Sequence, residues 1–255
     1  MHLSVINSGS SGNAYILEEG GNRLLLECGE PLRAVKQRLG YDLTGITACI
    51  VTHEHLDHAK HVASYIESFI PVYMSHGTKR AVTERYHLTD MQSDRITALD
   101  YSLTQIGAWR VIPFPTQHDA EEPVGYVIIA PSGDNLLFAT DTYYIKPRFR
   151  GLKHLLIECN YIDELATANY EEGYIDYRYY QRLQHSHMSL DNCLNFLGAN
   201  DLSKTRTITL CHLSEANSDP RAMIDAITGA TGIPTYIAQR GAEIALTDTP
   251  FLSMV

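Results

Sequence analysis

The residues with the clearest chemical potential are three histidines and one aspartate within six positions. His53, His55, Asp57 and His58 lie in the run THEHLDH. Histidines two apart on an extended segment point the same way, so His53 and His55 can bind one cation. Asp57 and His58 then offer an oxygen and another imidazole to a second cation. A solvated loop in which Asp57 or Thr52 caps a helix is the less favoured alternative, because this pattern is rare by chance.

Four ligands do not complete a two-metal site, so further His or Asp residues are expected where later strands end. Three such residues are present: His118 after the run 109–114, Asp141 after 135–139 and His212 after 207–210. Taken singly, they could be a loop histidine, a turn or helix cap and a buried core histidine. Together with the histidine-rich loop, their placement favours a metal site.

Short β-type runs alternate with helical periodicity along the chain, and no repeat or linker divides it. Strands are predicted at 2–6, 14–17, 23–28, 48–51, 155–157 and 207–210, with hairpins 101–106/109–114 and 124–130/135–139. Helices are predicted over 31–39, through Val62, Ile66 and Phe69 to Pro71, from the cap Ser189 to Gly198, and from the cap Asp219 to Gly229. The pattern predicts one domain, 1–255, with packed sheets and helices outside.

Composition narrows the functional classes. The chain has 255 residues, 20 Lys+Arg against 30 Asp+Glu, 12 His and a formal charge of −10. This acidity argues against bulk coating of nucleic acid but leaves room for a local phosphate site. The five cysteines form no CxxC pair, which indicates reduced thiols. The sequence has no signal peptide and no long apolar run, so we expect a cytoplasmic protein with no membrane partner.

Several segments along the chain carry a family resemblance, namely SGSSGNAYIL, THEHLDH, FPTQHDAEEPVGYVI, FATDT, LLIECN, HSHMS and LCHLSEAN. Together they resemble the metallo-β-lactamase superfamily, and most closely its small hydrolases of the WalJ/YycJ type. The resemblance spans nearly the whole chain and implies an α+β fold, a four-layer αββα sandwich with a metal site at one edge. It also implies the ligand sets: His53, His55 and His118 for one metal, Asp57, His58 and His212 for the other, and Asp141 as the bridge.

The resemblance implies two divalent metal ions as cofactors, and His/Asp ligation suits Zn or Mn, with Fe also compatible. Two cations roughly 3.5 to 4 Å apart activate a shared water as hydroxide. Asp57 is predicted to orient this water as well as to bind metal. The expected function is a dinuclear metal-dependent phosphodiesterase, an exonuclease-like nuclease whose partner is nucleic acid or another phosphodiester.

His187 is the second predicted catalytic residue. It lies just before a helix start, where backbone N–H groups favour an anion, and ribonuclease Z-like enzymes place a histidine at the corresponding position. We predict that His187 contacts phosphate or acts as a general acid, with Ser189, Ser11 and Asn13 as substrate contacts. The alternative is a surface His187 beside a helix cap. Ser186 departs from the family, where glycine is usual, and so does Tyr161, where histidine is frequent.

Two segments have open interpretations. The segment 142–153 holds four cations and no acid, which suits either a phosphate contact or a solvated loop. The segment 161–180 holds six of the 16 tyrosines, which suits either base stacking or a packed flap or oligomer interface.

Two other functional classes compete. A thioesterase or lactonase could use the same metals without His187. A non-hydrolytic metal-binding or redox protein is disfavoured, because iron-binding relatives have a carboxylate where this chain has His55. The choice between DNA and RNA, the cleavage polarity and the oligomeric state stay open.

Overall fold

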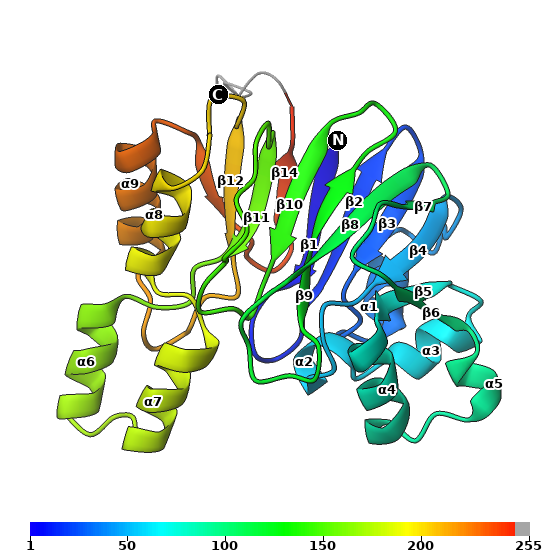
Figure 1. Ribbon diagram of the computed structural model, residues 1–255, viewed down its shortest axis with the longest axis horizontal. Coiled ribbons are helices and arrows are strands. Elements are labelled where there is room, and N and C mark those ends of the chain that lie inside the picture. The colour runs from blue at the N-terminus through cyan, green and yellow to red at the C-terminus, as the bar shows by residue number, and fades with distance from the viewer. Residues whose placement is uncertain (248–255) are drawn as a thin grey trace.

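The computed structural model describes residues 1–247, which form two seven-stranded sheets packed face to face (Figure 1). The first sheet has the order β14-β1-β2-β3-β4-β5-β6. Its strands are β1 (His2–Asn7), β2 (Ala14–Glu19), β3 (Asn22–Leu26), β4 (Ile46–Ile50), β5 (Val72–Ser75), β6 (Ile96–Leu99) and β14 (Glu243–Ala245). The second has the order β13-β12-β11-β10-β9-β8-β7. Its strands are β7 (Thr104–Ile106), β8 (Trp109–Pro115), β9 (Val124–Ile129), β10 (Asn135–Ala139), β11 (His154–Glu158), β12 (Thr207–Cys211) and β13 (Thr235–Ile237).

Helices cover the outer side of each sheet. Beside the first sheet lie α1 (Leu32–Arg38), α3 (Val62–Glu67), α4 (His76–Arg85) and α5 (Asp90–Ser93). Beside the second lie α8 (Leu190–Gly198) and α9 (Pro220–Thr231), which pack on each other. The short α2 (Leu56–Ala59) and the paired α6 (Asp163–Glu171) and α7 (Tyr177–Ser186) lie at the lower edge in Figure 1. The predicted α+β αββα sandwich is confirmed.

Three apolar layers hold these four layers together. The central one joins the inner faces of the two sheets, with Trp109, Tyr15 and Phe138 among its fully buried side chains. A second cluster packs the outer face of the first sheet on its helices, and a third does the same for the second sheet. All residues of β11 and β12 are buried, as expected for parallel strands covered on both faces.

Strand direction brings the chemical residues to one edge. In the first sheet β3 and β4 are parallel, and in the second β10, β11 and β12 are parallel. Because β8 and β10 are both antiparallel to β9, β8 ends at the same edge as β10. The carboxyl ends of all these strands therefore meet where the sequence analysis placed its candidate ligands.

Most predicted strands are confirmed, with local differences in where elements end. The strand predicted to reach Cys28 ends at Leu26, because Glu27 adopts a left-handed backbone with φ of 65°. The helix predicted through Phe69 ends at Glu67, and Phe69 turns outward with φ of 61°. The hairpin strand predicted from Tyr101 begins only at Thr104.

Gly229 is not the end of the last helix. It lies inside α9, and the C-cap is Gly232, whose φ of 70° gives the left-handed geometry of a helix stop. The predicted caps Ser189 and Asp219 are confirmed. The five cysteines are buried and free, as predicted.

Among the described residues, no helix combines the length and apolar character needed to cross a bilayer. The single domain predicted over 1–255 stays a prediction, and its last residues, 248–255, lie outside the described residues.

Candidate metal centre

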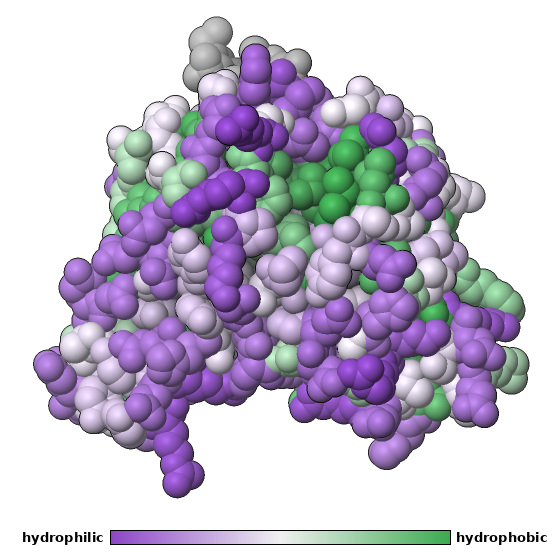
Figure 2. Space-filling model, viewed as in Figure 1, coloured by the Kyte–Doolittle hydropathy of each residue, from purple (hydrophilic) through white to green (hydrophobic). Residues whose placement is uncertain are grey.

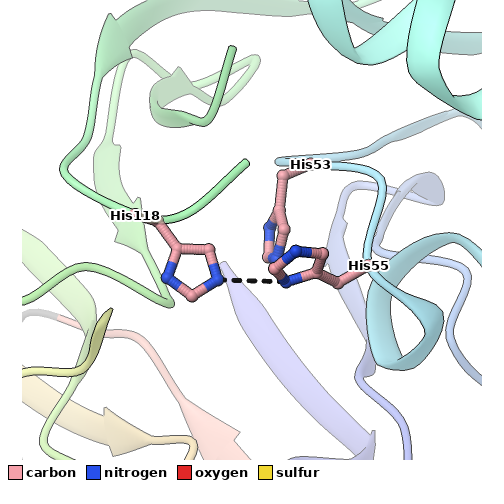
Figure 3. Close-up of side chains that lie close together, drawn as sticks. All are labelled: His53, His55 and His118. Atoms are coloured by element: carbon pink, nitrogen blue, oxygen red, sulfur yellow. Dashed lines mark hydrogen bonds between the residues drawn. The ribbon is translucent and has the colours of Figure 1, made fainter. Parts of the chain in front are cut away.

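His53, His55 and His118 form one cluster of ring nitrogens, which we call the three-histidine group. The loop after β4 supplies the first two and the loop after β8 supplies the third (Figure 3). His118 Nε2 lies 3.1 Å from His55 Nδ1. His53 Nε2 is buried with no hydrogen-bond partner. Three ring nitrogens that converge in this way are better placed to bind a shared cation than to hydrogen-bond to one another.

Neutral partners orient the rings of this group. The carbonyl oxygen of Ser186 lies 2.9 Å from His118 Nδ1, which must donate to it. His118 Nε2 therefore keeps its lone pair for the centre of the group. Thr52 Oγ1 lies 3.0 Å from His53 Nδ1. Ser186 thus supports the site through its main chain.

Asp57, His58, Asp141 and His212 form a second cluster, which we call the Asp/His group. Asp57 Oδ2 lies 3.2 Å from His212 Nε2 and 3.3 Å from His58 Nε2. These side chains come from α2 and from the ends of β10 and β12. Nitrogen and oxygen donors are mixed here, whereas the first group offers nitrogen alone.

Asp141 lies between the two groups. Its Oδ1 is 3.3 Å from His58 Nε2, and its Oδ2 is 3.6 Å from His118 Nε2 and 3.8 Å from His53 Nε2. Thr140 Oγ1 donates a hydrogen bond of 2.8 Å to Oδ1. The two oxygens of this carboxylate thus face different groups, which is the arrangement a bridging ligand needs.

The two groups differ in their titration. Burial lowers the pKa of His53 well below 6.5, and burial also lowers the pKa of His118. Burial alone would lower the pKa of His212 too, but the carboxylates of Asp141, Asp57 and Glu158 together outweigh it and raise this pKa to about 10. The same balance raises the pKa of His58 well above 6.5. The carboxylates of the second group thus stabilise positive charge on the histidines beside them.

Strained backbone positions several of these side chains. Asp141 and His212 adopt positive φ of 48° and 54°, a conformation that residues other than glycine seldom take. His212 directly follows β12, and Asp141 follows β10 after one intervening residue. At both positions the strained backbone turns the chain sharply at the sheet edge. Such strain persists only where the surroundings fix it, as they do at functional sites.

Sequence reasoning missed two buried glutamates. Glu27 follows β3, and its Oε1 lies 3.6 Å from His58 Nδ1. Glu158 ends β11, and its Oε1 lies 2.7 Å from His187 Nδ1 and 3.5 Å from His212 Nδ1. The position of Glu158 in the sequence could have identified it as a site residue, because it ends a strand beside those that carry Asp141 and His212.

His187 lies beside the Asp/His group. Its ring stacks on that of His212, with centroids 5.4 Å apart and planes 13° apart. Burial alone would lower the pKa of His187, but the Glu158 carboxylate raises it above 6.5. Because Glu158 accepts the Nδ1 hydrogen, Nε2 is the nitrogen left to exchange a proton with a ligand.

A cavity of about 480 Å³ opens over the centre. Residues from both groups and His187 line it, namely His55, Asp57, Asp141, His187 and His212. Around them lie Ser10, Leu56, Asn160, Tyr179, Arg182, Leu183 and residues 213–216. Four of the seven candidate ligands therefore border a space that a substrate could enter.

The three predicted substrate contacts are not among the residues that line this cavity. Asn13 is buried and holds the α2 loop, with Nδ2 donating to the Asp57 carbonyl at 3.3 Å. Ser189 is buried as the cap of α8, and Ser11 accepts from Asn7. Ser10, which was not predicted, does line the cavity. Binding roles for Ser11, Asn13 and Ser189 stay predictions.

The basic segment does not extend into the cavity lining either. Lys153 immediately precedes β11, whose other end carries Glu158, and it pairs with Asp134. At about 3.3 Å per strand residue, five residues of β11 separate it from the site. This placement favours the solvated-loop interpretation for Lys153.

The donor set fits two metal ions. The orphaned His53 nitrogen, the other imidazoles of the first group and the carboxylates of the second are the donors that Zn and Mn take in proteins.

Comparison with known proteins agrees with this geometry. A model of the β-lactamase superfamily domain matches residues 22–212. The chain belongs to the β-lactamase superfamily. Within the superfamily it is 26% identical over 226 residues to the exodeoxyribonuclease WalJ of Streptococcus pneumoniae serotype 2 (strain D39 / NCTC 7466), covering 84% of this chain and 82% of WalJ. The resemblance to proteins of the WalJ/YycJ type is confirmed.

Solved structures share the fold of this superfamily member. The metallo-β-lactamase fold protein YhfI of Bacillus subtilis aligns with a TM-score of 0.72 at 16% identity, over 95% of this chain and 98% of YhfI. Zn²⁺-bound PqqB from Methylobacterium extorquens aligns with a TM-score of 0.69 at 14% identity, over 96% and 100%. The family and the two ligand groups together identify a metallo-hydrolase with a metallo-β-lactamase fold.

Proposed function

We propose that this protein is a phosphodiesterase with two divalent metal ions, Zn or Mn, and that its substrate is nucleic acid cleaved in the manner of an exonuclease. The observation that carries the proposal is the Glu158–His187 pair beside the Asp/His group, in the lining of the same cavity. The relation to the exodeoxyribonuclease WalJ supports nucleic acid as the substrate.

The three-histidine group would hold one metal ion, the Asp/His group the other, and Asp141 would bridge. When bound, the two ions supply a water of lowered pKa and positive charge against phosphate oxygens. Asp57, which lines the cavity, orients the attacking water by accepting a hydrogen bond. His187 carries a proton at Nε2 and delivers it to the leaving oxygen, while Glu158 holds the ring by its Nδ1 hydrogen.

The need for a proton donor separates the candidate substrates. An alkoxide leaving from a phosphodiester is a strong base, so a positioned acid accelerates its departure. A thiolate leaves readily without such help, so a thioesterase would have little use for His187. The Glu158–His187 pair therefore favours phosphodiesters over thioesters.

An activity panel tests the proposal. The metal-loaded protein, with Zn and with Mn, is assayed on 5′-phosphorylated DNA, RNA, bis(4-nitrophenyl) phosphate, a thioester and a lactone. We expect cleavage of the phosphodiesters. Turnover confined to the thioester or the lactone would overturn the proposal.

The substitution His187→Ala tests the proton donor. We expect kcat on a phosphodiester to fall about 100-fold, about 2.7 kcal/mol, with the metal content kept near two ions per chain. His185→Ala is the matched control, because His185 is exposed on the same helix. Equal kcat values for the two variants would remove the role of His187.

A further inference from the structure

The hairpin of α6 and α7 stands beside the metal centre, at the lower left in Figure 1. It is held by a small apolar cluster of its own, Tyr161, Ala166 and Leu183, with Tyr180 packed against it. In Figure 2 this lobe is largely hydrophilic, and the outline of the molecule is notched between it and the lobe that carries α4. The hairpin thus forms one wall of the approach to the site.

One face of α7 connects that wall to the chemistry. Tyr179, Arg182, Leu183 and Ser186 follow one another at spacings of three, one and three, which places them along one side of α7, and His187 follows directly as its C-cap. Ser186 is buried, whereas Tyr179, Arg182 and the largely buried Leu183 line the same cavity as His187. At 1.5 Å per residue, Tyr179 lies about 12 Å along the helix from His187.

This face is tied to the three-histidine group. Ser186 accepts from His118 through its carbonyl oxygen, and its Oγ donates to Asp119 Oδ1 at 3.3 Å. Arg182 Nε lies 3.7 Å from Asp119 Oδ2. Because Asp119 follows His118 in the chain, these contacts fix the position of this helix face relative to the candidate metal ligands.

Tyr179 is 47% exposed in this position, and Leu56 of α2, which also lines the cavity, is 56% exposed. An aromatic ring and an aliphatic side chain at the rim offer apolar surface, and Arg182 offers a cation near them. A ligand that combines a flat apolar ring with a phosphate would match all three side chains.

We propose that Tyr179 and Arg182 bind a nucleotide of a single-stranded nucleic acid next to the scissile one, with its base stacked on Tyr179 and a phosphate held by Arg182. This inference rests on the proposed function and names its substrate as a single strand. In a duplex the base next to the scissile nucleotide is stacked between its neighbours, so only an unpaired base offers a face to the tyrosine.

The charge of the protein predicts how this binding depends on salt. A chain of net charge −10 with one arginine in its cavity lining gains little from the release of counterions. Each neutralised phosphate of a single strand contributes a slope of about −0.7 in log K against log salt, so Arg182 contributes about that much. Stacking on Tyr179 adds no such dependence.

Fluorescence anisotropy measures this binding directly. The probe is a labelled single-stranded oligodeoxythymidylate with phosphorothioate linkages, added to the metal-loaded protein. Tyr179→Ala is expected to weaken binding about tenfold, and Tyr179→Phe to keep affinity within about twofold because the ring remains. Tyr174→Ala is the matched control, since Tyr174 is an exposed tyrosine of the same hairpin outside the cavity lining.

Arg182→Gln is expected to weaken binding about fivefold and to reduce the salt slope by about 0.7. In kinetics, Tyr179→Ala is expected to raise KM for the oligonucleotide about tenfold more than KM for bis(4-nitrophenyl) phosphate.

The outcomes separate the two proposals. Equal affinities of Tyr179→Ala and Tyr174→Ala, or no binding of the oligonucleotide by the wild-type chain, overturn the binding role. Binding that depends on Tyr179 without cleavage of any phosphodiester keeps the binding role and overturns the proposed function.

Discussion

The three-histidine group and the Asp/His group lie side by side, yet the pKa values of their rings are shifted in opposite directions. His53 and His118 have uncharged oxygen atoms as partners of Nδ1, and burial lowers the pKa of each. His58 and His212 lie among carboxylates, and their pKa values are raised. The same residue type is therefore a neutral donor in one group and a charge partner in the other.

Because of this difference, a metal ion would encounter a different electrostatic environment in each group. Because burial lowers the pKa of His53 and of His118, these two rings offer lone pairs to a metal ion without first losing a proton. The second carries buried negative charge that a divalent cation would neutralise, which inverts the local pKa values. Asp141 couples the groups because its oxygens face both.

The largest expected effect follows from removal of that coupling. Asp141→Asn keeps the shape of the side chain but loses the charge shared by both groups. We expect phosphodiesterase activity to fall at least about 1000-fold, about 4 kcal/mol, and bound metal to fall below one ion per chain. Activity assays and elemental analysis measure these effects, and a variant that keeps two ions and its full rate would contradict the bridge.

His55→Ala is the counterpart, because His55 belongs to the three-histidine group alone. We expect about one ion per chain to remain, held by the Asp/His group. Loss of both ions would mean that the two groups do not act as separate binding sites.

A smaller effect is expected from the backbone that supports the Asp/His group. A Cβ on Gly29 would lie 1.7 Å from the Asp57 carbonyl oxygen, so the α2 loop must move. Gly29→Ala is expected to lower the free energy of unfolding by about 3 kcal/mol, measured by urea denaturation. Gly229→Ala is the control: it lies inside α9 with open space at its Cβ, so we expect a gain of up to about 1 kcal/mol. Similar losses in both variants would remove the steric explanation.

The smallest effect concerns His154, a buried histidine outside both groups. Its Nδ1 faces the hydroxyl of Thr207, and burial lowers its pKa to about 4. The unfolded chain, with a pKa near 6.5, binds the extra proton between pH 6.5 and 4, so the contribution of neutral His154 to stability is present above pH 6.5 and lost as pH falls.

We therefore expect wild type to lose about 2 kcal/mol relative to His154→Gln between pH 6.5 and 4.5. Denaturation at several pH values measures this difference, from which the titrations shared by both proteins cancel. If the stability difference between wild type and His154→Gln does not change with pH, burial does not lower the pKa of His154 in the folded protein.

Part of this protein is decided locally. The loop of His53, His55, Asp57 and His58, the caps Ser189 and Asp219 and most strands follow from residue types at short spacing, which act over a few residues. The same local reasoning misplaced the helix stop at Gly229. A glycine can also lie inside a helix, as Gly229 does, and the helix ends only at Gly232, where the left-handed turn forms.

Residue types and their spacing along the chain already show which donors exist and that they follow strand ends. The fold decides which donors face one another, because strand order brings β3, β4, β8, β10, β11 and β12 to one edge. It also decided the roles of Glu27 and Glu158, whose histidine partners are distant in sequence. The charge and tautomer of each site histidine also depend on the fold, since burial and the neighbouring carboxylates, not residue type, determine them.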